Sequence, residues 1–359
     1  MKICFAIHDF RAGGAERVMS ALANELAMSD NLEISIICFE GNNSEYFYTL
    51  SERIKFHTIS FKHFFDSEDL LKMINPDIIV SFCNPMNYFI SVLSRKADML
   101  HIACERNNPY FSPTSEIDRQ NRNKAFFNAT GCVFQTSEAE SYFKGRLSGK
   151  TAIIKNPVIL DFQPENTIVR ERKIVTVGRY VEQKNYPALL QAFASFYKKY
   201  PHYLLETYGK NSGMYNDIVK LAETIGINDC VSFNKETTEV HRKIYNASVF
   251  VLTSSFEGLS NALAEAAALG IPCVATDTAG TRDIIKKYEC GILVPANNPD
   301  AIAKAIEKII CNPSLANFFS KNGKRILLDK SIKKIAEQWL SFFSYVTQTY
   351  KKGDNYALR

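Results

Sequence analysis

Two carboxylates stand eight residues apart in segment 250–266, which is typical of an apolar strand, a polar loop and an alanine-rich helix. Glu257 lies in the loop, and Glu265 lies in the helix. If the helix begins near Leu259, Asn261 and Glu265 are four residues apart and share one face. This spacing would let one carboxylate hold sugar hydroxyls while the other holds a ribose diol.

The loop and the first turn of this helix are suited to binding an anion. Ser260 or a neighbour can cap the helix, and the free backbone N–H groups at the positive end of the helix dipole favour a diphosphate. Gly258 would let the backbone approach that anion closely. The alternative is that Glu257 only complements the helix dipole and that Glu265 is a surface residue. Another segment is needed to decide between these interpretations.

Two cations five residues apart follow the apolar strand that ends at Val177. They are Arg179 and Lys184, and Gly178 precedes them. When the bond to a nucleoside diphosphate breaks, the growing charge must be stabilised by a metal or by Arg and Lys. The sequence has no Asp-X-Asp motif, so we expect the cations to do this without a metal or other cofactor. Each cation alone would be interpreted as a surface charge, but the combination with Glu257 is specific.

Polar groups also follow strands in the amino-terminal half of the chain. Gly13 and Gly14 come after the first strand and open a helix, which forms a small anion-accepting loop. The dinucleotide fingerprint G-x-G-x-x-G is not satisfied there, and this disfavours a nicotinamide or flavin enzyme. Strand 99–104 ends in Glu105 and Arg106, a carboxylate and a guanidinium, although this segment could equally only shape a turn.

The elements that must position these residues alternate between short apolar runs and longer amphipathic ones. This alternation predicts α/β architecture, with two Rossmann-like, doubly wound parallel sheets that face a cleft and a linker near 157–171. The predicted strands lie near 2–7, 33–39, 55–60, 77–82, 99–104, 131–135, 151–155, 173–177, 203–208, 230–233, 248–252, 272–275 and 291–294. The predicted helices lie near 14–28, 84–97, 116–127, 137–144, 186–199, 214–225, 238–246, 260–268, 299–311 and 332–350.

The composition is that of an ordinary folded protein, with 46% hydrophobic and 23% charged residues, which excludes a disordered or fibrous chain. A length of 359 residues favours two domains. The net charge of +5 is spread along the chain, so no nucleic-acid partner is expected. The nine cysteines include no C-x-x-C pair, which favours a reducing compartment. No signal peptide or spanning apolar segment is visible, so we expect a cytoplasmic protein whose membrane contact is at most peripheral.

Together these segments resemble the retaining GT-B glycosyltransferases called family 4, over most of residues 1–345. The resemblance rests on a Gly-Arg…Lys segment, a Glu-x7-Glu segment and Gly-Gly-Ala-Glu after the first strand. It implies that Arg179 and Lys184 bind the donor diphosphate, that Glu257 contacts the donor sugar and that Glu265 holds the ribose hydroxyls. Arg179, Lys184 and Glu257 would then be the catalytic residues.

The resemblance implies further contacts with the donor, from the backbone at the helix start, from a turn near the nucleotide and from the glycines after the first strand. Many family members have a His at the position of Arg106. The Glu-Arg-Asn-x-Pro form found here resembles a branch that builds bacterial surface polysaccharides, and it favours Arg106 as a donor or acceptor contact. The implied donor-binding set is Gly13, Gly14, Arg106, Gly209, Gly258, Leu259, Ser260, Asn261 and Glu265.

The resemblance also implies the roles of the domains and the reaction. Residues 1–160, joined by a returning C-terminal helix at about 335–359, would bind the acceptor, and residues 161–334 would bind the donor. A hexose or N-acetylhexosamine would move, with retention, from a nucleotide sugar, preferably UDP-linked, to a glycan or polyprenyl-diphosphate-linked oligosaccharide. Such acceptors belong to capsule, O-antigen or exopolysaccharide synthesis at the inner face of the cell membrane.

Two other classes of function stay open. A nucleotide-sugar epimerase could share the architecture, but it needs additional acid/base residues that we do not identify. A non-catalytic sugar-nucleotide-binding subunit would bind the donor without transfer, and the intact charged residues of the donor segments disfavour it. Helix 116–127 carries Arg and Lys beside aromatics and could touch anionic lipid headgroups, or it could simply pack through those aromatics.

Overall fold

The computed structural model describes residues 1–11, 13–40, 48–59, 66–162 and 168–351. The chain divides into two compact units, each with its own sheet and core. The first unit contains Met1–Pro157 together with the chain from Ser331 onward, and the second unit contains Val158–Lys330. The chain therefore passes between the units twice, after Pro157 and after Lys330.

The sheet of the first unit has seven parallel strands in the order β3-β2-β1-β4-β5-β6-β7. The strand order changes direction between β1 and β4, so loops that follow these strands diverge to opposite faces and leave room for a ligand. Both faces are covered, and every residue of β4, β5 and β6 is buried. The strands are β1 Lys2–Asp9, β2 Glu33–Glu40, β3 Lys55–Thr58, β4 Ile78–Phe82, β5 Leu100–Cys104, β6 Gly131–Phe134 and β7 Lys150–Ile153.

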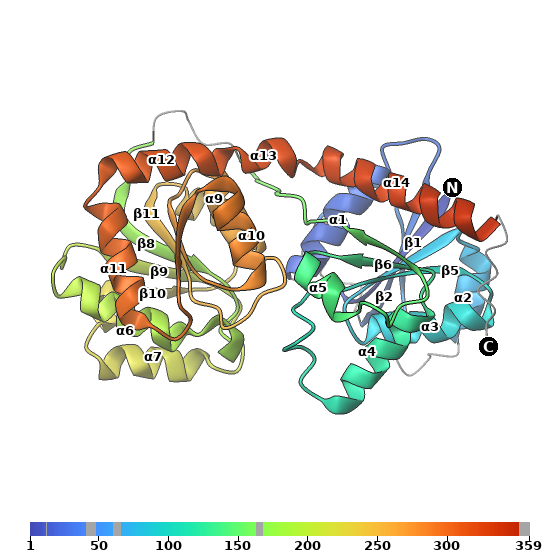
Figure 1. Ribbon diagram of the computed structural model, residues 1–359, viewed down its shortest axis with the longest axis horizontal. Coiled ribbons are helices and arrows are strands. Elements are labelled where there is room, and N and C mark those ends of the chain that lie inside the picture. Colours follow the sequence, from blue (N-terminus) through green and yellow to red (C-terminus); the bar gives the residue numbers. More distant parts are fainter. Residues whose placement is uncertain (12, 41–47, 60–65, 163–167, 352–359) are drawn as a thin grey trace. The chain divides into compact units, whose positions relative to one another are not determined.

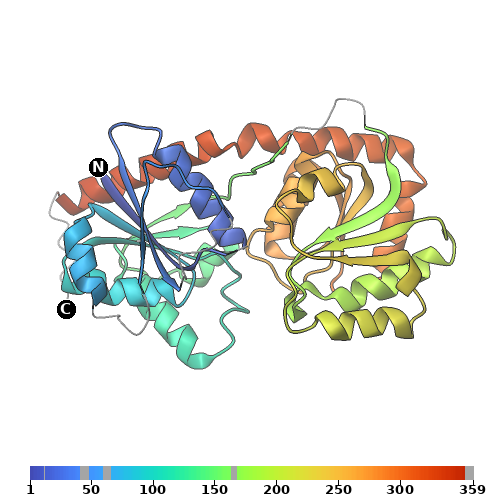
Figure 2. The same ribbon diagram turned by 180° about the vertical axis from the view of Figure 1, so that it is seen from behind.

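Helices pack on both faces of this sheet (Figures 1 and 2). α1 and α14 share one core with alternate residues of the central strands, and α2 to α5 cover the other face. The bounds are α1 Gly14–Leu26, α2 Asp66–Ile74, α3 Met86–Lys96, α4 Glu116–Asn128, α5 Ser137–Tyr142 and α14 Ile332–Lys351.

The C-terminal helix α14 belongs to the first unit. It lies along α1 (Figure 1) and buries its apolar side against the sheet. Trp339 is 1% exposed, and its ring stacks on Phe82 of β4 at a centroid distance of 6.2 Å. Because Trp339 lies more than 250 residues after Phe82, this stack fastens the end of the chain to the middle of the first sheet.

The sheet of the second unit has six parallel strands in the order β10-β9-β8-β11-β12-β13. Here the order changes direction between β8 and β11. α6, α7 and α11 share one core with the sheet, and α8, α9, α10 and α13 share the other. The strands are β8 Glu171–Val177, β9 Leu204–Tyr208, β10 Val231–Asn234, β11 Ala247–Leu252, β12 Cys273–Thr276 and β13 Gly291–Val294. The helices are α6 Tyr186–Tyr197, α7 Tyr215–Thr224, α8 Val240–Ile244, α9 Asn261–Ala268, α10 Ala279–Tyr288, α11 Pro299–Ile310, α12 Pro313–Lys324 and α13 Ile326–Asp329.

Four helices, α2, α10, α12 and α13, were not among the sequence predictions. α10 and α12 each contain a glycine, Gly280 and Gly323, which lowers intrinsic helix propensity. Both glycines lie against backbone that a side chain would strike: an added Cβ would be 1.9 Å from the Gly258 oxygen at Gly280, and 2.3 Å from the Ala267 oxygen at Gly323. Tertiary packing, which sequence propensity does not contain, therefore explains these two glycines.

Within the described ranges, no helix combines the length and the apolar character needed to cross a membrane.

Candidate functional site

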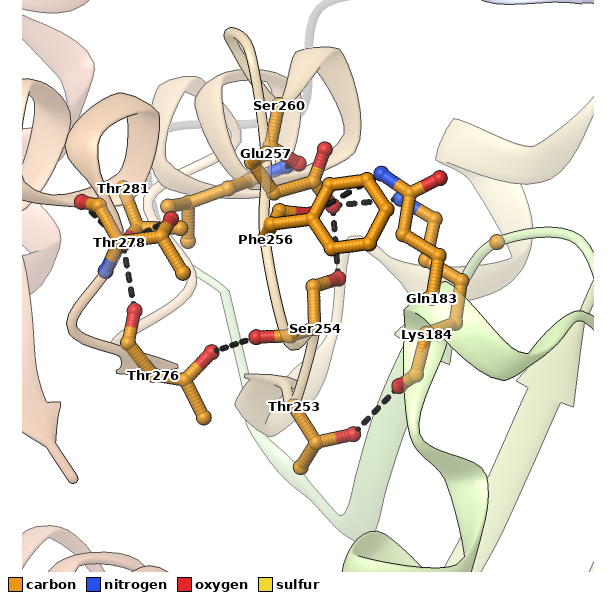
Figure 3. A network of polar contacts seen from close by, with 12 residues as sticks. Gln183, Lys184, Thr253, Ser254, Phe256, Glu257, Ser260, Thr276, Thr278 and Thr281 are labelled. Atoms are coloured by element: carbon orange, nitrogen blue, oxygen red, sulfur yellow. Dashed lines mark hydrogen bonds and ion pairs between the residues drawn. The ribbon is translucent and has the colours of Figure 1, made fainter. Parts of the chain in front are cut away.

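The candidate site lies in the second unit, on the loops that follow β8 and β11. These strands pair in parallel, with Val175 opposite Phe250, so their carboxyl ends adjoin at the point where the strand order changes direction. The first loop carries Lys184, and the second carries Glu257. Their side chains meet in an ion pair, with Lys184 Nζ 2.6 Å from Glu257 Oε1 (Figure 3).

Glu257 is buried and is held from two sides. Its side chain is 8% exposed, and Oε1 accepts hydrogen bonds from Lys184 Nζ and from Ser254 Oγ, each at 2.6 Å. α9 begins at Asn261, four residues later, so Glu257 is outside the first helical turn. The interpretation of Glu257 as a simple partner of the helix dipole is therefore wrong, since its contacts are with a cation and a hydroxyl.

Hydrogen bonds to backbone carbonyls join the two loops next to the ion pair. Thr253 Oγ1 donates to the Lys184 carbonyl at 2.9 Å, and Gln183 Nε2 donates to the Phe256 carbonyl at 2.9 Å (Figure 3). The Ser255 N–H donates to the Gln183 carbonyl at 2.8 Å. Lys184 itself ends a short 3-10 helix that starts at Glu182. These bonds fix the backbone of the loop that carries Lys184 against the loop that carries Glu257.

The first turn of α9 lies directly after Glu257. Ser260 is the N-cap, with its side chain accepting from the Leu263 N–H at 3.3 Å, as the sequence predicted for Ser260 or a neighbour. The helix starts at Asn261, two residues later than the assumed start at Leu259, but Asn261 and Glu265 are both helical and remain four residues apart. Leu259 and Ser260 are buried beside this turn.

The end of β12 and the start of α10 support the Glu257 loop from the left in Figure 3. Thr276 Oγ1 donates to the Ser254 carbonyl at 2.6 Å, and Thr281 closes a capping box with Thr278 at the start of α10. Gly280 in the first turn of α10 lies against the Gly258 carbonyl, as described above. The position of the Glu257 loop thus depends on Thr276 at the end of β12 and on Gly280 of a helix that the sequence prediction did not include.

The other predicted residues of the second unit lie around the same strand ends. Arg179 is exposed at the start of the Lys184 loop. Gly209 follows β9, and a Cβ there would be 1.9 Å from the Gly178 oxygen, so only glycine allows these two loops to touch. Glu265 is 6% exposed, and its Oε2 lies 3.1 Å from His241 Nε2. The interpretation of Glu265 as a surface residue is therefore wrong.

The predicted residues of the first unit lie at the carboxyl ends of its strands. Gly13 is the N-cap of α1, and Gly14 is the first helical residue. A Cβ at Gly13 would be 2.0 Å from a carboxylate oxygen of Glu16, so a larger residue would displace that side chain. The predicted contacts of Gly13 and Gly14 with the donor stay predictions.

Arg106 is packed into the first unit. Its guanidinium lies over the Phe82 ring at 3.7 Å, and Nη1 donates to Asn156 Oδ1 at 2.7 Å. Nε and Nη2 are buried and have no hydrogen-bond partner among the described residues. The neighbouring Glu105 is 6% exposed, and burial raises the pKa of its carboxyl to about 7. The predicted contact of Arg106 with substrate stays a prediction, and its two buried donors would be satisfied by such a contact.

Known proteins match this chain in sequence as well as in fold. A family model described as glycosyl transferases group 1 matches residues 159–326. An uncharacterized glycosyltransferase of Haemophilus influenzae is 26% identical, over 94% of this chain and 98% of its own length. A GalNAc-α-(1→4)-GalNAc-α-(1→3)-diNAcBac-PP-undecaprenol α-1,4-N-acetyl-D-galactosaminyltransferase of Campylobacter jejuni is 26% identical, over 96% of this chain and 99% of its own.

Solved structures show the same architecture. Anabaena HepE, solved in complex with UDP-glucose, superposes with a TM-score of 0.83 at 16% identity, over 96% of this chain and 100% of its own. A sucrose-phosphate synthase from Thermosynechococcus elongatus gives 0.82 at 18% identity, over 97% and 99%. The chain is a glycosyltransferase with the GT-B fold. The glycosyltransferase thus has the expected fold class, and the family match covers the unit that carries Lys184 and Glu257.

Sequence reasoning missed His241 in this glycosyltransferase. His241 lies on α8, is 1% exposed, and faces both Glu265 and Asp161. No signal in the sequence singled it out, because it lies inside a helix and not in a loop after a strand. The polar residues beneath the ion pair, Ser254 and Thr276, were also given no individual role.

Proposed function

We propose that the glycosyltransferase moves a hexose or N-acetylhexosamine from a UDP-linked donor, with retention of the anomeric configuration and without a metal ion. The acceptor is a glycan or a polyprenyl-diphosphate-linked oligosaccharide of bacterial surface polysaccharide synthesis. The observation that carries the proposal is the Lys184–Glu257 ion pair, held next to the capped start of α9. In this account the enzyme is a member of the retaining family 4.

The cations of the site would stabilise the leaving nucleoside diphosphate. Lys184 is anchored through its backbone, and Arg179 precedes it in the same loop. The start of α9 adds the positive end of a helix dipole. Charge that develops on the diphosphate oxygens is stabilised most by groups that are already in place. These groups do the work that a divalent cation would do in an enzyme with an Asp-X-Asp motif.

Glu257 would orient the transferred sugar. Both of its hydrogen bonds from described residues end on Oε1. Oε2 accepts none within the described part of the chain, so it is the oxygen that we assign to a sugar hydroxyl. A carboxylate that accepts from a hydroxyl contributes about 1.5–3 kcal/mol of binding when the site is closed to water. Glu265, buried eight residues later, is assigned to the ribose hydroxyls.

The choice of donor and acceptor is supported by the two whole-length similarities. HepE was solved with UDP-glucose, and the Campylobacter relative is described as an N-acetyl-D-galactosaminyltransferase of a PP-undecaprenol-linked glycan. A product linked through diphosphate to a long lipid would place the enzyme at the inner face of the membrane. Tyr110, Phe111 and Ile117 are at least half exposed on and before α4, which supports a peripheral contact there.

The test is a donor panel followed by identification of the product. Purified enzyme is incubated in EDTA with UDP-, GDP- and ADP-sugars and with lipid-linked acceptors, and nucleotide release is measured. We expect UDP release from one sugar, unaffected by EDTA, and an α-linked product from the α-donor by NMR. A β-linked product would contradict retention, and activity that needs added Mg²⁺ or Mn²⁺ would contradict the metal-free mechanism.

A further inference from the structure

His241 on α8 is enclosed between two carboxylates from distant parts of the second unit. Its Nε2 lies 3.1 Å from Glu265 Oε2, and its Nδ1 contacts Asp161 Oδ1. The Asp161 N–H also points at Nδ1, at 3.2 Å. Since His241 is 1% exposed, solvent does not compete for its ring nitrogens. The contacts join α8, α9 and the connector, which we define as residues 158–162.

The hydrogen-bond inventory fixes the direction of the contact with Glu265. An ionised carboxylate only accepts hydrogen bonds, so Nε2 must carry a proton to bind it. Nδ1 can then accept from the Asp161 N–H, or it can donate to the Asp161 carboxylate if the ring is protonated. In both cases Nε2–H donates to Glu265. Asp161 therefore holds Nδ1, and Nε2 is the ring nitrogen that meets Glu265.

Glu265 needs such a partner because it is buried. It is 6% exposed in the second turn of α9, so its carboxylate is largely removed from water. A donor fixed from a neighbouring helix favours one orientation of that carboxylate and offsets part of the cost of burying the charge. In metal sites, outer partners of this kind orient the residues that bind the ligand, and the same logic applies to a carboxylate that receives hydroxyls.

Asp161 connects this contact to the crossing between the units. It lies four residues after Pro157, where the chain leaves the first unit. The connector is also tied to the second crossing, because the Val158 N–H donates to the Lys330 carbonyl at 2.8 Å. His241 thus links the carboxylate assigned to the ribose with the segment through which the first unit continues into the second.

We propose that His241 is a positioning residue, which holds the Glu265 carboxylate in the orientation that receives the donor ribose hydroxyls and couples it to the connector through Asp161. The inference rests on the proposed function of Glu265. It adds a residue that acts on nucleoside recognition without touching the nucleoside. It also makes the connector a determinant of donor affinity.

The experiment compares binding of UDP and of 2′,3′-dideoxy-UDP by calorimetry. The ratio of the two dissociation constants isolates the ribose hydroxyls. We expect wild type to prefer UDP by roughly tenfold or more, the effect of hydrogen bonds to a buried charged group. Glu265→Gln should bring the ratio close to one. His241→Ala should lower the ratio at least several-fold, and His241→Ala combined with Glu265→Gln should lower it no further than Glu265→Gln alone.

Further variants separate positioning from mere packing. His241→Gln keeps an N–H donor near the position of Nε2, so it should restore much of the ratio that His241→Ala loses. Asp161→Ala should lower the ratio in the same direction, since it removes the carboxylate beside Nδ1 and leaves only the backbone N–H to hold the ring. His202→Ala, at an exposed histidine of the same unit, is the matched control and should leave the ratio unchanged. Melting curves of each variant show whether it is folded.

The outcomes are distinct. If His241→Ala weakens UDP and 2′,3′-dideoxy-UDP equally, or His241→Gln rescues nothing, His241 only packs and the inference is overturned while Glu265 keeps its role. If Glu265→Gln leaves the ratio of wild type intact, the assignment of Glu265 to the ribose fails first, and the inference falls with it. Should His241→Ala not fold, His241→Gln and Asp161→Ala carry the same comparison.

Discussion

Lys184 Nζ and Glu257 Oε1 are 2.6 Å apart although 73 positions separate the residues in the chain. They meet because β8 and β11 pair at the centre of the second sheet, and because side chains of the loops after these strands donate to backbone carbonyls of the neighbouring loop. The side chains of this ion pair are only 16% and 8% exposed, so removing their charges from water costs free energy. Its place beside the first turn of α9 is explained if both groups serve a substrate.

Glu257→Gln should reduce sugar transfer far more than nucleotide binding. The amide keeps the size of the side chain but loses the charge that accepts from Lys184, from Ser254 and, in our proposal, from a sugar hydroxyl. We expect kcat to fall by about 10²–10³, with the dissociation constant of UDP changed little. Steady-state kinetics and calorimetry measure the two quantities. Equal losses in UDP binding and in kcat/KM would contradict the assignment of Glu257 to the transferred sugar.

Gly280→Ala should disturb the site and the fold together. Its Cβ would strike the Gly258 carbonyl at 1.9 Å, so the loop that carries Glu257 must move. Overpacking of this kind costs about 1–3 kcal/mol. Gly323→Ala is the control, because its Cβ would strike the Ala267 carbonyl on the far end of α9. Both variants should melt earlier, but only Gly280→Ala should lose donor affinity; equal affinity in the two would contradict the role of Gly280.

Trp339→Ala should destabilise the first unit, because the indole is 1% exposed and stacks on Phe82. Removing a large buried aromatic costs about 3–5 kcal/mol. Tyr345→Ala on the same helix is the control, since Tyr345 is 50% exposed. Chemical denaturation followed by circular dichroism should show a clearly lower midpoint for Trp339→Ala. The midpoint of Tyr345→Ala should be almost the same as that of wild type. An unchanged midpoint for Trp339→Ala would show that α14 is not part of the core.

Glu105→Gln should stabilise the protein increasingly as pH rises. Burial raises the pKa of the Glu105 carboxyl from 4.5 to about 7 in the folded protein. Below pH 4.5 both states hold the proton and the variant gains nothing. Between pH 4.5 and about 7 only the unfolded chain ionises, which costs wild type stability, up to a limit on the order of 3 kcal/mol above pH 7.

Melting temperatures of Glu105→Gln and wild type across pH 4 to 9 measure this effect, with the exposed Glu223→Gln as the matched control. The gain in melting temperature should appear through the window from about pH 4.5 to 7 and then stay constant. A gain that is largest at low pH would show that Glu105 is held ionised and would reverse the sign of the argument.

The alternation of apolar and amphipathic segments predicted every described strand of both sheets and most of the described helices. The strands are recognisable because a buried parallel strand is apolar over most of its length. The alternation does not contain the strand order, so it could not show that Lys184 and Glu257 form an ion pair. Their shared role came from the types of residue after Val177 and Leu252 and from the resemblance to a family. The return of α14 to the first unit came from that resemblance as well.

The residues that the sequence did not predict either pack closely against another part of the backbone or lie within a helix. Gly280 and Gly323 lower helix propensity and are explained only by the carbonyls they touch. His241 lies within a helix and meets Glu265 and Asp161 only after α8, α9 and the connector are assembled. Contacts of this kind depend on tertiary structure, which a single sequence does not display.

Nucleotide release from the preferred donor in EDTA, compared between wild type, Lys184→Ala and Lys199→Ala, tests the central claim most directly. Lys199 forms an exposed ion pair with Glu307 in the same unit at 3.2 Å, so its loss should leave the rate unchanged. We predict that Lys184→Ala lowers the rate by about 10²–10³ without unfolding. A Lys184→Ala enzyme that is as active as Lys199→Ala would contradict the assignment of Lys184 to the leaving diphosphate.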